Sequence, residues 1–245
     1  MNQLKAIALT LLATSSACLA GEALFSSGPQ RVSLLELYTS EGCSSCPPAE
    51  ALFAGFRNDP HLWKEIVPVA FHVTYFDRLG WKDRFGSEQF TARQKAYGQL
   101  WSAENIYTPC LVENGVEWRS RSSTKAPANA AGTLRVQCSE DGHASVIFKP
   151  ASDLPVAHFE VNVAVLGGGL STDVRRGENA GKKLDHEFVA FELKHAPLAS
   201  QPDGTFTGVI DFTKPQARAP RTALAVWVTE DKSLIPLQTA GGWLD

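Results

Sequence analysis

The sequence predicts an α/β domain followed by a smaller, β-rich domain. Residues 30–120 mix helical and strand patterns, whereas short strand-like segments separated by turn signals dominate after residue 132. A Cys-x-x-Cys motif, Cys43 to Cys46, lies where a short apolar run gives way to a helical pattern. That placement is more typical of a redox site than of a structural bridge.

The first half begins with a buried strand over residues 31–38 and a helix that opens at Pro47 or Pro48. Proline suits a first helical turn, which needs no backbone donor. Apolar residues recur at i, i+3, i+4 and i+7 from Ala49 to Phe56, and Pro60 stops the helix.

The remainder of the first half predicts a second buried strand within residues 66–76 and a second helix. Ser87 is the expected cap of that helix, which runs to about Trp101. A short strand follows over residues 110–113, and Asn114-Gly115 is a hairpin turn signal.

The second half predicts a small β-sandwich or barrel. Residues 120–132 lack apolar periodicity and predict a linker or covering loop. Strand candidates then recur at short intervals. The expected strands are residues 134–138, 144–149, 159–166, 188–194, 205–212 and 223–229. The expected domains are a signal peptide at 1–20, an α/β domain at 21–120 and a β-rich domain at 121–245.

The chain starts with the features of a secretory signal peptide. Lys5 is followed by an apolar stretch, and small residues lead to Ala20, after which we expect cleavage. Lipidation at Cys18 is the alternative, but Ser15 stands where lipoprotein signals usually carry a leucine-like residue. The sequence therefore predicts a periplasmic or secreted protein.

The charge and the cysteine content limit the kinds of partner and of covalent bond that we expect. The formal charge of −3 becomes −4 when Lys5 is removed, because 22 basic residues then face 26 acidic ones. The sequence has no block of basic residues, which would have predicted a nucleic-acid partner. After the signal peptide, no segment is long and apolar enough to cross a membrane. Four cysteines remain after cleavage, an even count that fits two disulfides in an exported protein.

The expected redox chemistry uses Cys43 and Cys46. A helix N-terminus stabilises a thiolate at Cys43, and that thiolate attacks a disulfide. Cys46, one turn further on, resolves the mixed disulfide. A purely structural bridge is disfavoured, since so small a loop contributes little loop entropy. Thr108 and Pro109 are the expected substrate-binding pair, because a cis proline opening a strand exposes backbone groups to an extended client.

Two motifs resemble known sequences. Leu37-Tyr38-Thr39 with Gly42-Cys43-x-x-Cys46 resembles the first strand and active-site loop of glutaredoxins. Thr108-Pro109 through Asn114-Gly115 resembles their T-x-P and N-G segment. The wider pattern, including Arg176–Gly181 and Leu184–His186, is similar to a bacterial family of secreted thioredoxin-like proteins without assigned activity. The resemblance implies a thioredoxin-like domain at 21–120 with a helical insertion.

Departures from ordinary thioredoxins leave some roles open. Gly42 and Pro47-Pro48 replace the usual neighbours of the two cysteines. Glu36 roughly matches the buried acid that moves a proton to the second cysteine, but it lies one residue further from Cys43. It is either that proton relay or a hydrogen-bonded strand residue. His72 faces either the site or the core, and a satisfied core histidine is the favoured alternative.

The sequence leaves two possible roles for Cys110. It either exchanges with the active-site pair or forms a structural disulfide with Cys138, and the even count favours the disulfide. Mixed charges at Trp81–Arg84 predict either a substrate-facing lip or a solvated surface. Arg175–Asn179 and Asp185-His186 suggest an anion or metal site, but metal-ligand spacing is missing, and a turn-rich loop between strands is the favoured alternative. No metal and no cofactor are therefore expected.

Three functions follow from these residues. The first is an exported thiol–disulfide oxidoreductase acting on protein disulfides or on a redox partner. The second is a copper chaperone that uses Cys43, Cys46 and His72, although the only methionine is Met1 and is lost on cleavage. The third is a binding module that has lost its chemistry.

Overall fold

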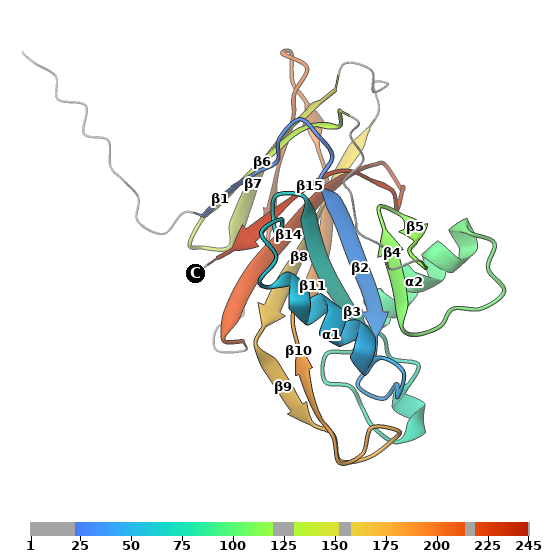
Figure 1. The fold of residues 1–245 in the computed structure, drawn as a ribbon. Coiled ribbons are helices and arrows are strands. Elements are labelled where there is room, and N and C mark those ends of the chain that lie inside the picture. The colour runs from blue at the N-terminus through green and yellow to red at the C-terminus, as the bar shows by residue number, and fades with distance from the viewer. Residues whose placement is uncertain (1–22, 120–129, 152–157, 214–218, 245) are drawn as a thin grey trace, which may run out of the picture.

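The computed structural model describes residues 23–119, 130–151, 158–213 and 219–244. Within these ranges the chain forms two α-helices, a 3-10 helix and fifteen strands, so the fold is mostly β (Figure 1). The helices are α1 (Pro47–Phe56), η1 (Asp77–Leu79) and α2 (Glu88–Leu100). The strands are β1 (Ala23–Ser26), β2 (Ser33–Thr39), β3 (Ile66–His72), β4 (Cys110–Glu113), β5 (Val116–Glu117), β6 (Gly132–Cys138), β7 (His143–Pro150), β8 (Phe159–Gly168), β9 (Leu170–Asp173), β10 (Lys183–His186), β11 (Val189–Pro197), β12 (Ala199–Ser200), β13 (Phe206–Asp211), β14 (Arg221–Glu230) and β15 (Pro236–Trp243).

Eight strands form one mixed sheet in the order β15-β14-β8-β11-β3-β2-β4-β5. Strand β2 runs parallel to β3 and antiparallel to β4. Strand β11 pairs in parallel with β3 where Val189 meets Ala70. This sheet joins strands from both sides of residue 120. The expected fold class, an α/β thioredoxin-like domain followed by a smaller β-rich domain, is therefore wrong.

The correction has a physical cause in the long strands of the second half. Strands β8 and β14 are buried along most of their length on both faces. A strand buried on both faces needs a packed layer on each side, so it belongs inside a larger assembly. Residues 120–129, where the domain boundary was expected, lie outside the described residues, and the division at residue 120 stays a prediction.

A second sheet of five strands, in the order β1-β6-β7-β13-β12, packs against the large sheet. Side chains of β7 alternate between exposed and buried, as in a strand with one face in water. The buried residues Val136 and Phe148 of this sheet share a core with Val163 and Val226 of the large sheet. The two sheets thus form a sandwich around this core.

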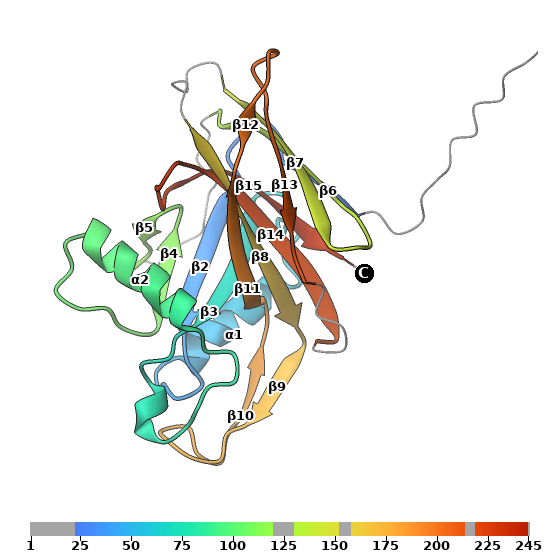
Figure 2. The same ribbon diagram turned by 180° about the vertical axis from the view of Figure 1, so that it is seen from behind.

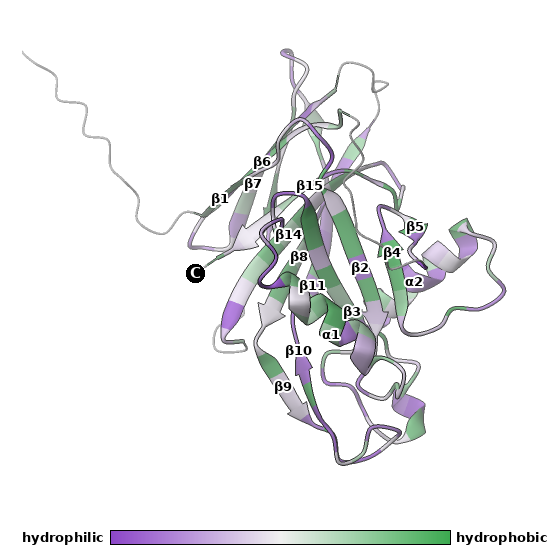
Figure 3. Cartoon of the chain, viewed as in Figure 1, coloured by the Kyte–Doolittle hydropathy of each residue, from purple (hydrophilic) through white to green (hydrophobic). Residues whose placement is uncertain are grey.

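The two α-helices lie on opposite faces of β2 (Figure 2). Leu37 faces α1, where it packs with Phe53, whereas Tyr38 faces α2, where it packs with Tyr97. Hydrophobic residues follow the strands of the large sheet (Figure 3). The helix expected from the Ser87 cap is confirmed, since Ser87 Oγ accepts a hydrogen bond from the Gln89 N–H at 3.2 Å.

A two-stranded ribbon of β9 and β10 extends beyond the large sheet beside α1 (Figure 1). Asp173 pairs with Lys183 at its tip and Leu170 pairs with His186 at its base. The ribbon and its connecting loop bring residues of the second half to the start of α1. The expected signal peptide, residues 1–20, lies outside the described residues.

The described helices are all too short or too polar to cross a bilayer. This agrees with the expectation of no membrane span.

Candidate functional site

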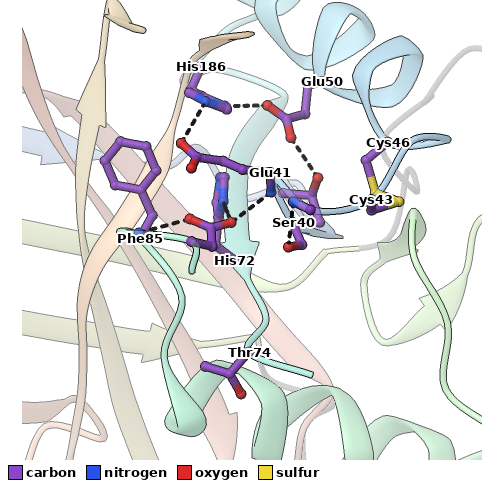
Figure 4. Close-up of polar contacts among 12 residues, drawn as sticks. Ser40, Glu41, Cys43, Cys46, Glu50, His72, Thr74, Phe85 and His186 are labelled. Atoms are coloured by element: carbon purple, nitrogen blue, oxygen red, sulfur yellow. Dashed lines mark hydrogen bonds and ion pairs between the residues drawn. A yellow bond between two sulfur atoms is a disulfide. The ribbon is translucent and has the colours of Figure 1, made fainter. Parts of the chain in front are cut away.

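Cys43 and Cys46 form a disulfide between the end of β2 and the start of α1 (Figure 4). Their Cα atoms are 5.4 Å apart, and Cys46 is the residue that precedes the first turn of the helix. The strand-to-helix junction expected from the sequence is therefore present. Each cysteine is only 1 % exposed, while the intervening Ser44 and Ser45 are exposed.

The first turn of α1 offers the sulfur atoms fewer backbone donors than expected. Pro47 and Pro48 carry no N–H group, and the N–H groups of Ala49 and Glu50 both donate to the Cys46 carbonyl. The expected backbone donors for a Cys43 thiolate are thus occupied or missing. The remaining polar neighbour is Ser45, whose Oγ lies 3.3 Å from Cys43 Sγ.

Thr108 and Pro109 lie beside this disulfide, as expected. The peptide bond between them is cis. The Ser45 hydroxyl donates a hydrogen bond to the Thr108 carbonyl at 3.5 Å. A pocket of about 300 Å³ lies next to this segment and is lined by Trp101, Tyr107 and Cys110 among others.

Residues 40–46, here called the cysteine loop, are held by the ribbon connection. The buried Asn179 side chain donates hydrogen bonds to the carbonyl oxygens of Glu41 at 2.9 Å and Cys43 at 2.8 Å. The Ser44 N–H donates to a Glu178 carboxylate oxygen at 2.9 Å and lowers the pKa of that carboxyl. The sequence indicated only a turn-rich loop here.

A buried group of acids and histidines lies behind the cysteine loop (Figure 4). We call it the histidine–carboxylate cluster, and its members are Glu41, Glu50, His72, Asp83 and His186. They come from five separate segments of the chain: the cysteine loop, α1, the end of β3, the loop after η1 and the end of β10. Each is at most 7 % exposed.

Asp83 organises one side of the histidine–carboxylate cluster. It accepts a hydrogen bond from His72 Nδ1 at 2.7 Å and from the N–H groups of Glu41 at 2.8 Å and Phe85 at 2.9 Å. Burial opposes ionisation of Asp83, but the charge and hydrogen bond of His72 lower its pKa overall. Asp83 is 2 % exposed, so it is not part of the solvated surface or lip considered for Trp81–Arg84.

His186 lies between two carboxylates. Its Nδ1 makes a short hydrogen bond with Glu50, and its Nε2 is 3.3 Å from Glu41 Oε1. Burial favours the neutral ring, but these two acids raise the pKa of His186 to about 10. Burial also opposes ionisation of Glu50, whose pKa is nevertheless lowered by His186.

Glu36 lies on the other face of β2, away from α1. Its carboxylate accepts two hydrogen bonds from Arg93, at 2.8 and 3.0 Å, and one each from the hydroxyls of Tyr38 and Tyr97. It is fully buried. These partners do not include the disulfide, so the geometry favours the alternative of a hydrogen-bonded strand residue.

The expected disulfide between Cys110 and Cys138 is not formed. Cys110 opens β4 in the core next to α2, whereas Cys138 ends β6 in the core between the two sheets. The two residues therefore belong to different layers. Burial and, to a lesser extent, the charge of Glu117 raise the pKa of the Cys110 thiol to about 12.

The sequence does not predict that the members of the histidine–carboxylate cluster lie together, although it draws attention to each histidine separately. His72 and His186 are separated by more than a hundred residues, so no local spacing connects them. Two signals were available in the sequence: Glu41 and Glu50 lie close to the cysteine motif, and Asp185-His186 suggests an anion or metal site. His72 lies in the core with its Nδ1 paired to Asp83, but its Nε2 has no partner among the described residues, so it is not the fully satisfied core histidine that the sequence favoured.

Two solved structures resemble this chain in fold. A protein of Agrobacterium tumefaciens has 18 % sequence identity and a TM-score of 0.57, with 88 % of this chain and 95 % of that chain covered. HBP35 of Porphyromonas gingivalis has 14 % identity and a TM-score of 0.56, with 88 % and 76 % covered. Identities this low show a shared fold alone.

A comparison with curated proteins finds no match. The resemblance to thioredoxins receives no support from a family model, whereas the expected family without assigned activity does. The model described as "Protein of unknown function (DUF1223)" matches residues 34–229, and the chain belongs to this DUF1223 family.

Proposed function

We propose that this protein is a thiol–disulfide oxidoreductase of the periplasm or cell exterior, with Cys43–Cys46 as its redox-active pair. The observation that supports this best is the position of the disulfide. It lies between a buried strand and a helix, with the Thr108 carbonyl within reach of Ser45. An extended client that pairs with the backbone near Thr108 would present its own disulfide to this loop.

The reaction transfers two electrons between the cysteine pair and a client. In the reductive direction the Cys43 thiolate attacks one client sulfur, forms a mixed disulfide and displaces the other client sulfur as a thiolate. The Cys46 thiolate then attacks Cys43 Sγ. This step restores the Cys43–Cys46 disulfide, releases the second client thiol and leaves the client reduced. Oxidation of a client is the same sequence in reverse.

Access to the sulfur atoms requires movement of the cysteine loop. Both cysteines are 1 % exposed, and the hydrogen bonds from Asn179 hold the loop in place. The exposed Ser44 and Ser45 form the surface that a client meets first. The pocket beside Thr108, with the half-exposed Tyr107 at its rim, is the adjoining surface for client side chains.

The test is a redox titration of the full chain in glutathione buffers, with the Cys43–Cys46 pair followed by alkylation and mass spectrometry. An exchange-active pair reaches equilibrium with glutathione. A potential near that of thioredoxin, about −270 mV, indicates a reductase, and one near −120 mV an oxidase. Catalysed reduction of insulin should disappear in Cys43→Ala and persist in Cys110→Ala. A pair that does not exchange with glutathione contradicts the proposal.

The copper hypothesis has its own test. Reduced protein is titrated with Cu(I) beside the Cys43→Ser/Cys46→Ser double variant. Equal affinities exclude the copper chaperone that uses these cysteines.

A further inference from the structure

We propose that Glu50, His72 and His186 form a buried binding site for a divalent transition-metal ion such as Zn²⁺. The three residues come from α1, from the end of β3 and from the end of β10. A bound ion would therefore join the helix that follows the cysteine loop to the central sheet and to the ribbon. The proposal is independent of the thiol chemistry, since neither cysteine is a ligand.

The positions of the side chains fit one ion. Glu50, His72 and His186 each offer one ligand atom, and these atoms all lie within 4.8 Å of one another. The three side chains are turned toward one another in the close-up view (Figure 4). Zinc ligands lie at about 2.0–2.2 Å from the ion, so two ligand atoms of a tetrahedral site are about 3.4 Å apart. Binding therefore requires the three side chains to adjust to these spacings.

His72 is oriented as a metal ligand. Its Nδ1 donates to the buried Asp83 carboxylate, which is itself fixed by the N–H groups of Glu41 and Phe85. This bond keeps the proton of a neutral ring on Nδ1 and leaves the Nε2 lone pair available. His72 Nε2 is buried and has no hydrogen-bond partner among the described residues. A carboxylate behind a histidine is the usual outer partner of a metal-bound imidazole.

The charge of the cluster also favours a cation. Three buried carboxylates, Glu41, Glu50 and Asp83, face two imidazoles, so a net negative charge of one remains even if both rings are protonated. Within the described ranges, their printed ion pairs involve only His72 and His186, and no lysine or arginine. An uncompensated buried charge is costly, and a divalent ion offsets it.

The donor set selects the class of metal. Two imidazoles and a carboxylate suit Zn²⁺ and its first-row neighbours, whereas Mg²⁺ and Ca²⁺ prefer all-oxygen sites. Glu41 Oε1 is buried beside these ligands, 3.3 Å from His186 Nε2, and has no hydrogen-bond partner among the described residues. Binding requires a ligating imidazole nitrogen without its proton, so metal uptake at His186 releases a proton to solvent.

The test measures zinc in the full chain. The protein is stripped with EDTA in denaturant, refolded with ZnCl₂, desalted and analysed for metal content. We expect one zinc per chain and a higher Tm than that of the metal-free protein. Glu50→Gln and His186→Gln should lose the bound zinc, and Asp83→Asn should bind it about 10- to 100-fold more weakly, as expected for an outer partner.

Matched controls use the other acid-paired histidines and the cysteines. His61 and His143 form exposed pairs with Glu65 and Asp211, so a His61→Ala/His143→Ala variant should retain the zinc. A Cys43→Ser/Cys46→Ser variant should retain it as well. Loss of zinc in either control overturns the proposal, as does a wild-type chain that refolds without binding zinc.

A spectroscopic measurement needs no variant and decides the case if the buried substitutions prevent folding. X-ray absorption at the zinc edge of the wild-type protein should show imidazole nitrogen and carboxylate oxygen ligands and no sulfur. A sulfur ligand, or a shell without imidazole, would place the zinc elsewhere and refute the site.

Discussion

Asn179 holds the cysteine loop through the carbonyl of Cys43, to which its side-chain amide donates a hydrogen bond of 2.8 Å. The same amide nitrogen donates to the Glu41 carbonyl at 2.9 Å. Asn179 is fully buried and lies 136 residues from Cys43 along the chain. A residue of the second half therefore fixes the backbone of the redox candidate in the first half.

Replacing Asn179 with alanine should destabilise the protein and loosen the cysteine loop. The Glu41 carbonyl loses this donor, whereas the Cys43 carbonyl keeps the N–H of Cys46 at 3.3 Å, and an unsatisfied buried group costs about 1–3 kcal/mol. The free energy of unfolding, measured in urea, should fall by at least that amount. Reduction of the Cys43–Cys46 disulfide by dithiothreitol should become faster, because the sulfur atoms are exposed more often.

The matched control is Asn105→Ala, at an exposed loop position. This substitution should change neither the unfolding free energy nor the reduction rate. Equal reduction rates in the Asn179→Ala variant and the wild type would show that the loop does not limit access to the disulfide.

Arg93 should matter more for stability than any surface ion pair. Its guanidinium makes two hydrogen bonds to the buried Glu36 carboxylate, and Arg93→Ala leaves that carboxylate uncompensated. Breaking a buried pair in this way costs about 3–5 kcal/mol. Chemical denaturation followed by tryptophan fluorescence measures the loss.

Arg119 provides the comparison, because its ion pair with Glu117 is largely exposed. Arg119→Ala should leave the free energy of unfolding close to that of the wild type, because exposed ion pairs contribute little. Similar losses in both variants would contradict the structural role assigned to the Glu36–Arg93 pair.

The Cys110 thiol should resist alkylation in the native protein. Burial raises its pKa to about 12 from the ordinary value of 9.0, so the thiol stays protonated at neutral pH. The unfolded chain loses this proton at lower pH than the folded chain. This contribution to stability is therefore present below pH 9 and is lost as the pH rises toward 12.

Iodoacetamide labelling followed by peptide mass spectrometry measures this protection. Native protein at pH 8 should label Cys110 slowly, and protein in guanidinium should label it fast. Fast native labelling at pH 8 would mean that the thiol is neither buried nor shifted in pKa.

The local elements were predictable from the sequence because each depends on nearby residues. Ser87 and the apolar period around Phe53 define the two helices, and the predicted strand at 31–38 corresponds to β2. Sheet partners were not predictable, because pairing between Val189 and Ala70 depends on long-range contacts. The fold class was wrong for that reason: alternation and propensity identify strands but not the sheet they join.

The candidate site also has a part that the sequence predicts and a part that it does not. The cysteine motif and Thr108-Pro109 were found because each is a short motif, and the structure brings them together. The cluster of His72 and His186 is built from separate loops and strand ends, so its members look like unrelated polar residues in sequence. Strand β10 of the ribbon carries His186 to the end of β3, where its ring lies 5.3 Å from that of His72.

Ser45 should tune the reactivity of Cys43. Its hydroxyl lies 3.3 Å from Cys43 Sγ. Pro47 and Pro48 have no N–H group to donate, so this hydroxyl can serve as a donor in their place. We expect this hydroxyl, which donates to the Thr108 carbonyl in the disulfide form, to donate to the thiolate in the reduced protein. A hydrogen bond to a charged group contributes about 1.5–3 kcal/mol. Ser45→Ala should therefore slow alkylation of reduced Cys43 at pH 7 by about tenfold, since 1.4 kcal/mol is a factor of ten.

Ser44→Ala is the matched control for this substitution. Ser44 is the exposed neighbour whose backbone N–H donates to Glu178, and the alanine variant keeps this backbone bond. Its alkylation rate should equal that of the wild type, measured with the same reagent at the same pH. If Ser45→Ala reacts as fast as Ser44→Ala, the hydroxyl does not stabilise the thiolate. The helix dipole then remains as the source of activation at Cys43.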